Sequence, residues 1–364
     1  MTLQLSKLNK EGIPDLVQLF KKNPILDGHN PFKQSSVEEF YWQFFSEDYE
    51  QSVYIFAADP DKDELAGTLG ALFIPMIGPD AKIYQTIKPE DALVNLKSII
   101  KHKNRDILKE MFEKICEETK SKDIKFLWGF TKEINVFHRL GFSHCFSSKQ
   151  GLFTLNIPNA YQHLASLNQS NKLKQKLQIL ALSVVSYSKA LILGSKIRDI
   201  NVKEIKLNEI NYEILWSFHP NNLYSIYLDK SFLEWRIENN PSELKFSILQ
   251  VTNQNNEILS YLIYSKKNKF VFFIDQFLFD PSLNNQTKKK IVNSAMGYLK
   301  KQNACIVRVM GFEHNQTNRE EIKILESVGF TFINKGIPFI FKTNDESIKP
   351  DNIYLSRLNT QGTF

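Results

Sequence analysis

One order of helices and strands occurs twice in this sequence. Each half opens with an acidic segment that contains tryptophan, Val37–Phe45 in the first half and Ser231–Pro241 in the second. Two apolar, strand-like runs follow, and after them come a helix with apolar residues three and four apart and a buried strand. In each half a short helix then ends at a Gly-Phe pair, which begins at Gly141 in the first half and at Gly329 in the second. Because both the order and the spacing recur, the sequence predicts a duplicated domain.

The predicted elements correspond one to one between the halves. In the first half we expect strands over residues 54–58, 69–74 and 124–130, and a long helix over 107–118. In the second half the corresponding strands are 246–251, 259–264 and 304–312, and the corresponding helix is 290–301. Strands followed by helices in this alternation predict an α/β protein.

The length agrees with two lobes, since 364 residues are about twice the usual length of one domain. We expect an N-terminal lobe over 1–160, a helical connector over 161–200, a C-terminal lobe over 201–345 and a tail over 346–364. The least polar stretch, Leu177–Leu193, is interrupted by polar residues and Lys189. It therefore contains more polar residues than a membrane-spanning helix tolerates. A connector helix is the simpler interpretation, and contact with a membrane surface through 177–193 stays open.

The charge and the cysteine content limit which kinds of partner and which cellular compartment are expected. The net charge of +6 suits an acidic partner without choosing one. The chain has neither a zinc-ligand spacing nor an aromatic RNA-binding signature, so we expect no DNA partner and no metal. Its three cysteines include no C-x-x-C pair, which favours a reducing compartment. The first residues lack an apolar core segment, and the expected location is therefore the cytoplasm.

The repeated order of elements, with its ending Leu140-Gly141-Phe142, resembles the GNAT family of N-acetyltransferases. This resemblance implies two acetyltransferase-like lobes, each a mixed, mostly antiparallel central sheet flanked by helices. The segment Glu234–Pro241 and the tail Tyr354–Gly362 are similar to those of acetyltransferase-like proteins found near surface-polysaccharide genes. An amino sugar is then the implied acceptor.

The family resemblance also implies a cofactor, acetyl-CoA or another acyl-CoA. In that family the pyrophosphate is held at the start of the long helix, where N–H groups lack helical partners and the helix dipole is positive. The matching turn supplies five candidate cofactor-binding residues: Lys103, Asn104, Arg105, Asp106 and Ile107. Asn104 and Asp106 stand where the family usually has glycines.

The second half differs at the same place. Its corresponding loop, Asp280–Thr287, contains no glycine and no cation. We therefore expect the C-terminal lobe to be degenerate and to bind no coenzyme.

Two residues are candidates for proton transfer. The family often has a tyrosine in the last helix, whereas this chain has Phe137 and Leu325, which cannot donate a proton. Glu90, in a turn expected at Pro89–Asp91, is a candidate base. His138, beside Phe137 on the last helix, is the other catalytic candidate. His102, in the predicted phosphate turn, is a candidate for cofactor contact rather than for proton transfer.

Three hypotheses follow for the function. The first is an acyl-CoA-dependent N-acyltransferase that transfers directly to the amine of a small molecule. The second is an aminoacyl transferase of the peptidoglycan-bridge type, which would take its acyl group from transfer RNA. The third is a binding or scaffold protein in which both lobes have lost their chemistry.

Overall fold

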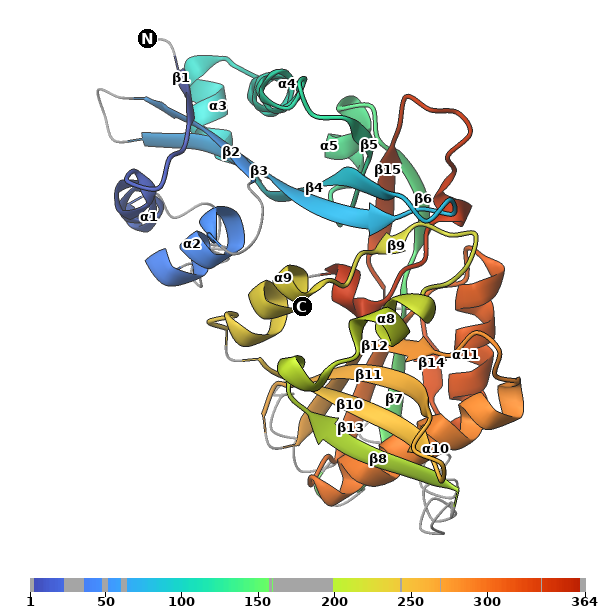
Figure 1. Ribbon diagram of the computed structural model, residues 1–364. Coiled ribbons are helices and arrows are strands. Elements are labelled where there is room, and N and C mark those ends of the chain that lie inside the picture. Colours follow the sequence, from blue (N-terminus) through green and yellow to red (C-terminus); the bar gives the residue numbers. More distant parts are fainter. Residues whose placement is uncertain are drawn as a thin grey trace. The chain divides into compact units, whose positions relative to one another are not determined.

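The computed structural model describes residues 3–22, 36–47, 52–59, 64–156, 159, 199–242, 244–268, 270–334 and 336–360 (Figure 1). These residues form two compact units. Unit 1 consists of Met1–Cys145, Glu234–Ser242 and Phe339–Ile348, and unit 2 consists of Phe146–Leu233, Glu243–Pro338 and Lys349–Phe364. The apolar stretch Leu177–Leu193 lies outside the described residues. None of the described helices is long and apolar enough to cross a membrane.

Unit 1 is built on one sheet with the strand order β1-β2-β3-β4-β5-β15-β6. Helices α1 and α2 cover one face of this sheet, and α3 and α4 cover the other (Figure 1). Its elements are β1 (Gln4–Lys7), α1 (Ile13–Lys22), α2 (Val37–Phe45), β2 (Val53–Asp59), β3 (Glu64–Ile77), β4 (Ile83–Val94), α3 (Leu96–His102), α4 (Ile107–Glu118), β5 (Ile124–Phe130), α5 (Ile134–Arg139), β6 (Ser143–Ser147), a π-helical turn (Glu234–Glu238) and β15 (Pro338–Lys342).

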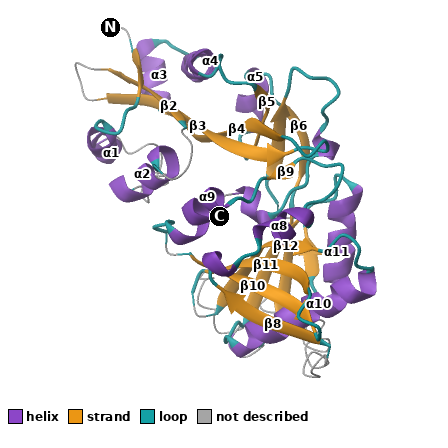
Figure 2. Ribbon diagram, viewed as in Figure 1, coloured by secondary structure: helices purple, strands orange, loops and turns teal. Residues whose placement is uncertain are grey.

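Unit 2 has a second sheet with the order β14-β7-β13-β12-β11-β10-β8, again with helices against it (Figure 2). Its elements are β7 (Lys149–Thr154), β8 (Ile200–Ile205), η2 (Leu207–Glu209), α8 (Tyr212–Ser217), β9 (Ser225–Ile226), α9 (Lys230–Leu233), β10 (Lys245–Asn253), β11 (Ile258–Lys266), β12 (Val271–Phe279), α10 (Asn285–Lys301), β13 (Ile306–Gly311), α11 (Gln316–Val328), β14 (Thr331–Ile333), η4 (Pro350–Asn352) and η5 (Arg357–Thr360).

The two halves of the chain exchange a strand. β7 follows the first half in sequence, yet it pairs with β13 and β14 in the sheet of unit 2. β15 follows the second half, yet it pairs with β5 in the sheet of unit 1. The units are therefore not contiguous in sequence and differ from the contiguous lobes expected at 1–160 and 201–345. Both strands are short, so their sequences carry no sign of which sheet they join.

The predicted fold class is confirmed, and several boundaries agree to the residue. α2, α4 and β5 begin and end where the sequence predicts. α10 begins earlier than predicted, at Asn285, because the Asn284 side chain accepts a hydrogen bond from the Thr287 N–H and caps the helix there. The turn expected at Pro89–Asp91 is wrong, because these residues lie inside β4.

A buried core holds α4 against the sheet of unit 1. Ile107, Met111 and Ile115 of α4 pack on Ile55 of β2 and Leu69 of β3. Phe137 and Phe142 close the same core, and between them Gly141 adopts a φ of +84° that ends the short helix. The position where the family often has tyrosine is therefore a core position here.

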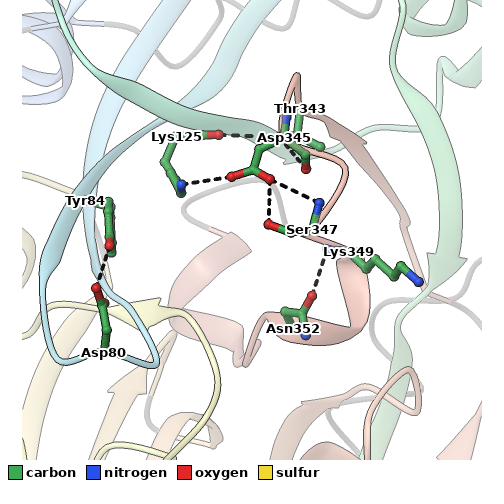
Figure 3. Close-up of polar contacts among 8 residues, drawn as sticks. All are labelled: Asp80, Tyr84, Lys125, Thr343, Asp345, Ser347, Lys349 and Asn352. Atoms are coloured by element: carbon green, nitrogen blue, oxygen red, sulfur yellow. Dashed lines mark hydrogen bonds and ion pairs between the residues drawn. The ribbon is translucent and has the colours of Figure 1, made fainter.

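An ion pair joins β5 to the segment that follows β15 (Figure 3). Lys125 Nζ lies 2.9 Å from Asp345 Oδ2, and Asp345 Oδ1 accepts hydrogen bonds from the N–H and hydroxyl of Ser347. The hydrogen bonds of Ser347 and Lys125 lower the pKa of Asp345 to about 2. The carboxylate thus connects two segments far apart in sequence within unit 1.

We expect Asp345→Asn to destabilise unit 1 at neutral pH. Since the pKa of Asp345 is lower in the folded than in the unfolded chain, its contribution is full above the ordinary aspartate pKa and is lost as the pH falls towards 2. Urea unfolding should therefore show a lower midpoint for the variant at pH 7 and a shrinking difference below about pH 4. Asp80→Asn is the matched control, because Asp80 accepts from Tyr84 within one hairpin. An equal effect of both variants would contradict the long-range role of Asp345.

Candidate active site

The central strands of unit 1 separate partway along their length. β4 and β5 run parallel and pair at Gln85–Ile124 and Ile87–Leu127. Within the continuous described stretch 64–156, the ladder stops before Pro89 and Gly129. Proline has no N–H to donate, so it ends the ladder, while β4 itself continues to Val94. The parallel pairing of β4 with β5 is therefore limited to residues before Pro89.

A β-bulge lies in β4 just beyond this point. The register between β3 and β4 shifts by one residue between Thr68 and Gly70. Asp91 has a φ of +49°, and its carbonyl accepts a hydrogen bond from the Thr68 hydroxyl at 2.8 Å. Such a bulge adds one residue to a strand and redirects its side chain. The sequence Pro89-Glu90-Asp91 therefore marks a bulge where a turn was expected.

The bulge gathers charged side chains on the face of the sheet that α2 covers. Ile87, Ala92 and Val94 contribute to the core beneath α4, so by strand alternation Lys88 and Glu90 project from the opposite face. Lys88 is only 2% exposed and forms an ion pair with Glu90. Burial and the nearby charge of Arg236 lower the pKa of Lys88, and Glu90 opposes that shift.

Asp91 joins this cluster electrostatically. Burial, reinforced by the charge of Glu90, raises the pKa of Asp91 to about 7, and Lys88 acts in the other direction. Burial and the nearby Asp91 raise the pKa of Tyr54 well above its ordinary value. A carboxyl group that titrates near neutral pH is suited to accept a proton from an amine. Of the two adjacent acids, Glu90 forms the ion pair with Lys88. Asp91 has a pKa of about 7, which suits a general base.

The two tryptophans that correspond in the sequence repeat meet in unit 1. The Trp42 and Trp235 rings stack with centroids 5.4 Å apart. Each indole N–H donates to the backbone carbonyl of the other residue, at 2.6 and 2.8 Å. This reciprocal contact holds the segment Glu234–Ser242 in unit 1 and so positions Arg236, which follows Trp235, beside the charged cluster.

The turn predicted to bind phosphate lies between α3 and α4. Lys103 ends α3 with a φ of +54°, and Asn104 Oδ1 accepts from the Asp106 N–H at 3.0 Å. Asp106 is the N-cap of α4, but its side chain makes no capping hydrogen bond among the described residues. The first-turn N–H groups of α4 thus keep the anion-binding character of a helix start, with Lys103 and Arg105 exposed beside them.

Unit 2 differs at both corresponding places. The start of α10 is capped by Asn284, and the Asp280 carboxylate accepts from the Ser282 N–H in the same loop. The ladder between β12 and β13 extends to the pair Ile274–Val309 in the register. Beyond that pair, residues 353–360, which we call the C-terminal segment, pack against β12.

The C-terminal segment is buried along its whole length. Arg357 forms an ion pair with Asp275 of β12 and lies over the Phe273 ring, 3.9 Å from its centroid. Ser356 donates a hydrogen bond to the side chain of Gln276. The C-terminal segment therefore packs against β12 beyond the end of its pairing with β13.

The two histidines named from sequence have different environments. His138 is exposed in the last turn of α5. His102 is turned away from the phosphate turn, with its Nε2 3.5 Å from Asp59 Oδ2. With Glu64 these residues bring three potential metal-ligand atoms within 4.8 Å of one another. Lys101 forms an ion pair with Glu64, so a protein cation already balances charge in this group.

Sequence reasoning named Glu90 and Asp91 but missed Lys88 and Arg236. Lys88 carried no clear signal, because its strand also contains other polar residues. Arg236 carried none, since it lies far away in sequence and reaches unit 1 through the tryptophan pair.

No family model and no curated protein sequence matches the chain. Solved structures do match. A GCN5-related N-acetyltransferase from Anabaena variabilis superposes with a TM-score of 0.60 at 8% identity, over 93% of this chain and 72% of the other. An N-myristoyltransferase from Saccharomyces cerevisiae with bound myristoyl-CoA has a TM-score of 0.59 at 11% identity, over 98% and 88%. A tandem GNAT protein from the clavulanic acid biosynthesis pathway has a TM-score of 0.52 at 10% identity, over 94% and 98%. The chain therefore has a tandem GNAT fold, and at these identities the likeness extends to the fold alone.

Proposed function

We propose that the protein is an acyl-CoA-dependent N-acyltransferase whose active site lies in unit 1. The observation that carries the proposal is the end of the parallel pairing between β4 and β5 at Ile87–Leu127, with the bulge at Asp91 just beyond it in β4. Backbone groups of β4 beyond the end of that pairing can bind an extended thioester donor. A carboxyl group with a pKa near 7 adjoins the same place.

The residues at the start of α4 suit the phosphates of the donor. Ile107 and the residues after it supply first-turn N–H groups, and Lys103 and Arg105 add positive charge. Asn104 shapes the turn through its bond to the Asp106 N–H. Acyl-CoA, when bound, supplies an acyl group activated as a thioester.

The residues of the chain then act on the acceptor. Asp91 takes the proton that the amine nitrogen loses as its bond to the acyl carbon forms. Burial and the charge of Glu90 raise the pKa of Asp91 to about 7, and Lys88 opposes that shift. His138 is a second candidate for proton transfer, from its exposed position on α5.

We extend the proposal to an amino sugar as acceptor and to a cytoplasmic location. The likeness of Glu234–Pro241 to acetyltransferase-like proteins of surface-polysaccharide synthesis supports that acceptor. Unit 2 takes a supporting role in this proposal, because the C-terminal segment packs against β12 and the start of α10 is capped.

A thermal-shift titration with acetyl-CoA tests the proposal. Ligand at about 100 times its Kd adds about 2.7 kcal/mol to the native state, which corresponds to a rise of about 5–10 °C in Tm. Arg105→Ala should reduce the shift, whereas Arg319→Ala, an equally exposed arginine on α11 of unit 2, should leave it unchanged. The absence of a Tm shift in the wild-type protein would contradict the proposal and favour the hypothesis of a binding or scaffold protein.

A further inference from the structure

Two carboxylates meet at one end of the pairing between β2 and β3 in unit 1. Asp59 is the last residue of β2 and Glu64 is the first of β3, and the two stand directly opposite each other in the antiparallel register. Like charges in directly opposite positions of a sheet repel each other. Asp59 is also only 2% exposed, which adds the cost of keeping a carboxylate away from water. A cation bound by both carboxylates would turn this repulsion into attraction.

Helix α3 faces this pair with its buried side. Ser98 and His102 are four positions apart, so they lie on the same face of the helix. Ser98 is fully buried, and the His102 side chain is only 4% exposed. Asp59, Glu64 and His102 each bring one potential ligand atom to a place where these atoms lie within 4.8 Å of one another. One imidazole and two carboxylates therefore converge there.

The separation of His102 and Asp59 fits metal coordination better than a hydrogen bond. A nitrogen donor and a carboxylate oxygen that share a hydrogen bond lie about 2.7–3.2 Å apart. His102 Nε2 lies farther from Asp59 Oδ2, at 3.5 Å. In a tetrahedral zinc site with bonds of about 2.1 Å, two neighbouring ligand atoms lie about 3.4 Å apart. The observed separation therefore matches one edge of such a site.

The Ser98 hydroxyl is a second observation that indicates a ligand at this place. Its oxygen is buried and has no hydrogen-bond partner among the residues that the structure describes. The ion pair with Lys101 lowers the pKa of Glu64, and Ser98 adds to that effect, so the hydroxyl lies close to the Glu64 carboxylate. A buried hydroxyl without a partner is costly, and a water molecule on a bound metal ion would supply one.

The ion pair between Lys101 and Glu64 is compatible with a metal ion. Lys101 contacts one oxygen of the carboxylate, Oε2. The other oxygen, Oε1, can coordinate a metal while Oε2 stays with the lysine. The Glu64 side chain is 20% exposed, so it has room to turn towards Asp59 and His102.

We propose that Asp59, Glu64 and His102 bind a zinc ion in unit 1. One imidazole among carboxylates favours zinc over magnesium and calcium, which prefer ligand sets of oxygen alone. The fourth position is left to a water molecule that hydrogen-bonds to Ser98. The three ligands come from separate elements without a recognisable spacing, which is why the sequence indicated no metal.

The zinc ion has a structural role in this proposal. It joins the end of β2, the start of β3 and the last turn of α3. His102 directly precedes Lys103, which ends α3, so the ion also fixes the beginning of the turn that leads into α4. The inference goes beyond the proposed function and does not depend on it, because the metal takes no part in acyl transfer.

Zinc titration of the metal-free, full-length protein tests the proposal. The protein is treated with EDTA, freed of the chelator and titrated with zinc chloride in a calorimeter. We expect one equivalent to bind, with a Kd on the order of micromolar or below. Asp59→Asn and His102→Ala should each raise the Kd by about 100-fold, because even partners outside the ligand shell are worth about 10–100-fold.

His144→Ala is the matched control for zinc bound elsewhere on unit 1. His144 is an exposed histidine on β6 and precedes Cys145, so its loss would also weaken zinc bound at that thiol. The variant should leave the Kd and the stoichiometry unchanged. Cobalt in place of zinc adds a spectroscopic check, since nitrogen and oxygen ligands give visible bands without the intense charge-transfer absorption of a cobalt thiolate.

Thermal unfolding keeps the test independent of whether each variant folds well. Zinc at about 100 times its Kd should raise the Tm of the wild-type protein by about 5–10 °C over its value in EDTA. Asp59→Asn keeps the size of the side chain and removes one of two opposed charges, so it should fold without metal. Its Tm should be the same in zinc and in EDTA.

Two results would overturn the inference. A wild-type protein that binds no zinc, with equal Tm in zinc and in EDTA, would leave Asp59 and His102 as an ion pair of the protein alone. Zinc binding that survives both Asp59→Asn and His102→Ala would place the metal elsewhere in the chain. The acetyl-CoA titration tests the proposed function separately, so either proposal can fail while the other stands.

Discussion

Asp91→Asn is expected to lower kcat for acyl transfer by about 10²–10⁴-fold, the usual contribution of a general base. The amide keeps the size of the side chain but cannot take up the amine proton. Free thiol released from acetyl-CoA in the presence of an amino-sugar acceptor gives the rate. Because the base must be ionised, the kcat/KM of the wild-type protein should rise with pH through about 7, the pKa of Asp91.

Two controls separate chemistry from folding. Burial disfavours the Asp91 carboxylate, so Asp91→Asn should not lower Tm. Glu90→Gln, the neighbouring acid, removes the ion pair with Lys88 and should shift the pH profile rather than abolish activity. An Asp91→Asn variant with wild-type kcat and an unchanged pH profile would show that Asp91 is not the base.

Arg357→Ala is expected to cost about 3–5 kcal/mol of unfolding free energy in unit 2, because it leaves the Asp275 carboxylate buried without its cation. Asp275 is 1% exposed and Arg357 is 9% exposed, so water cannot replace the lost partner without opening the C-terminal segment. Urea unfolding gives the free energy, and hydrogen exchange of residues 353–360 reports whether the segment opens.

The double variant Asp275→Leu with Arg357→Met should recover most of that loss, since it removes both buried charges together. Arg319→Ala, on the exposed face of α11, should change the free energy by about 0.5 kcal/mol or less. A small effect of Arg357→Ala would mean that the ion pair contributes little to holding the C-terminal segment.

Local patterns predicted the individual elements well. The capping box of Ser36 and Glu39 begins α2, and the apolar spacing of α4 and the apolar run of β5 are complete within their own sequences. The bulge at Asp91 was misjudged, because Pro-Glu-Asp is also typical of a turn. Pairing with β3 holds that sequence in a strand.

The candidate site was predictable in part for the same reason. The turn between α3 and α4 follows from the start of a helix, which is a local signal, and phosphate binding by its residues stays a prediction. The charged cluster depends on Arg236, which joins β4 only because Trp235 stacks on Trp42. His102 was misread as a cofactor contact, because the sequence does not indicate that it faces Asp59.

By itself, then, the sequence determined the duplication, the α/β class and the positions of the helices and strands, since each of these arises from periodicity and capping within one segment. The tertiary structure alone decided the strand exchange of β7 and β15, the pKa of Asp91 and the burial of the C-terminal segment in unit 2. These features depend on strand pairing, burial and charge among residues far apart in the chain. The interaction energies arise only when these residues come into contact, and no local sequence pattern predicts such contacts.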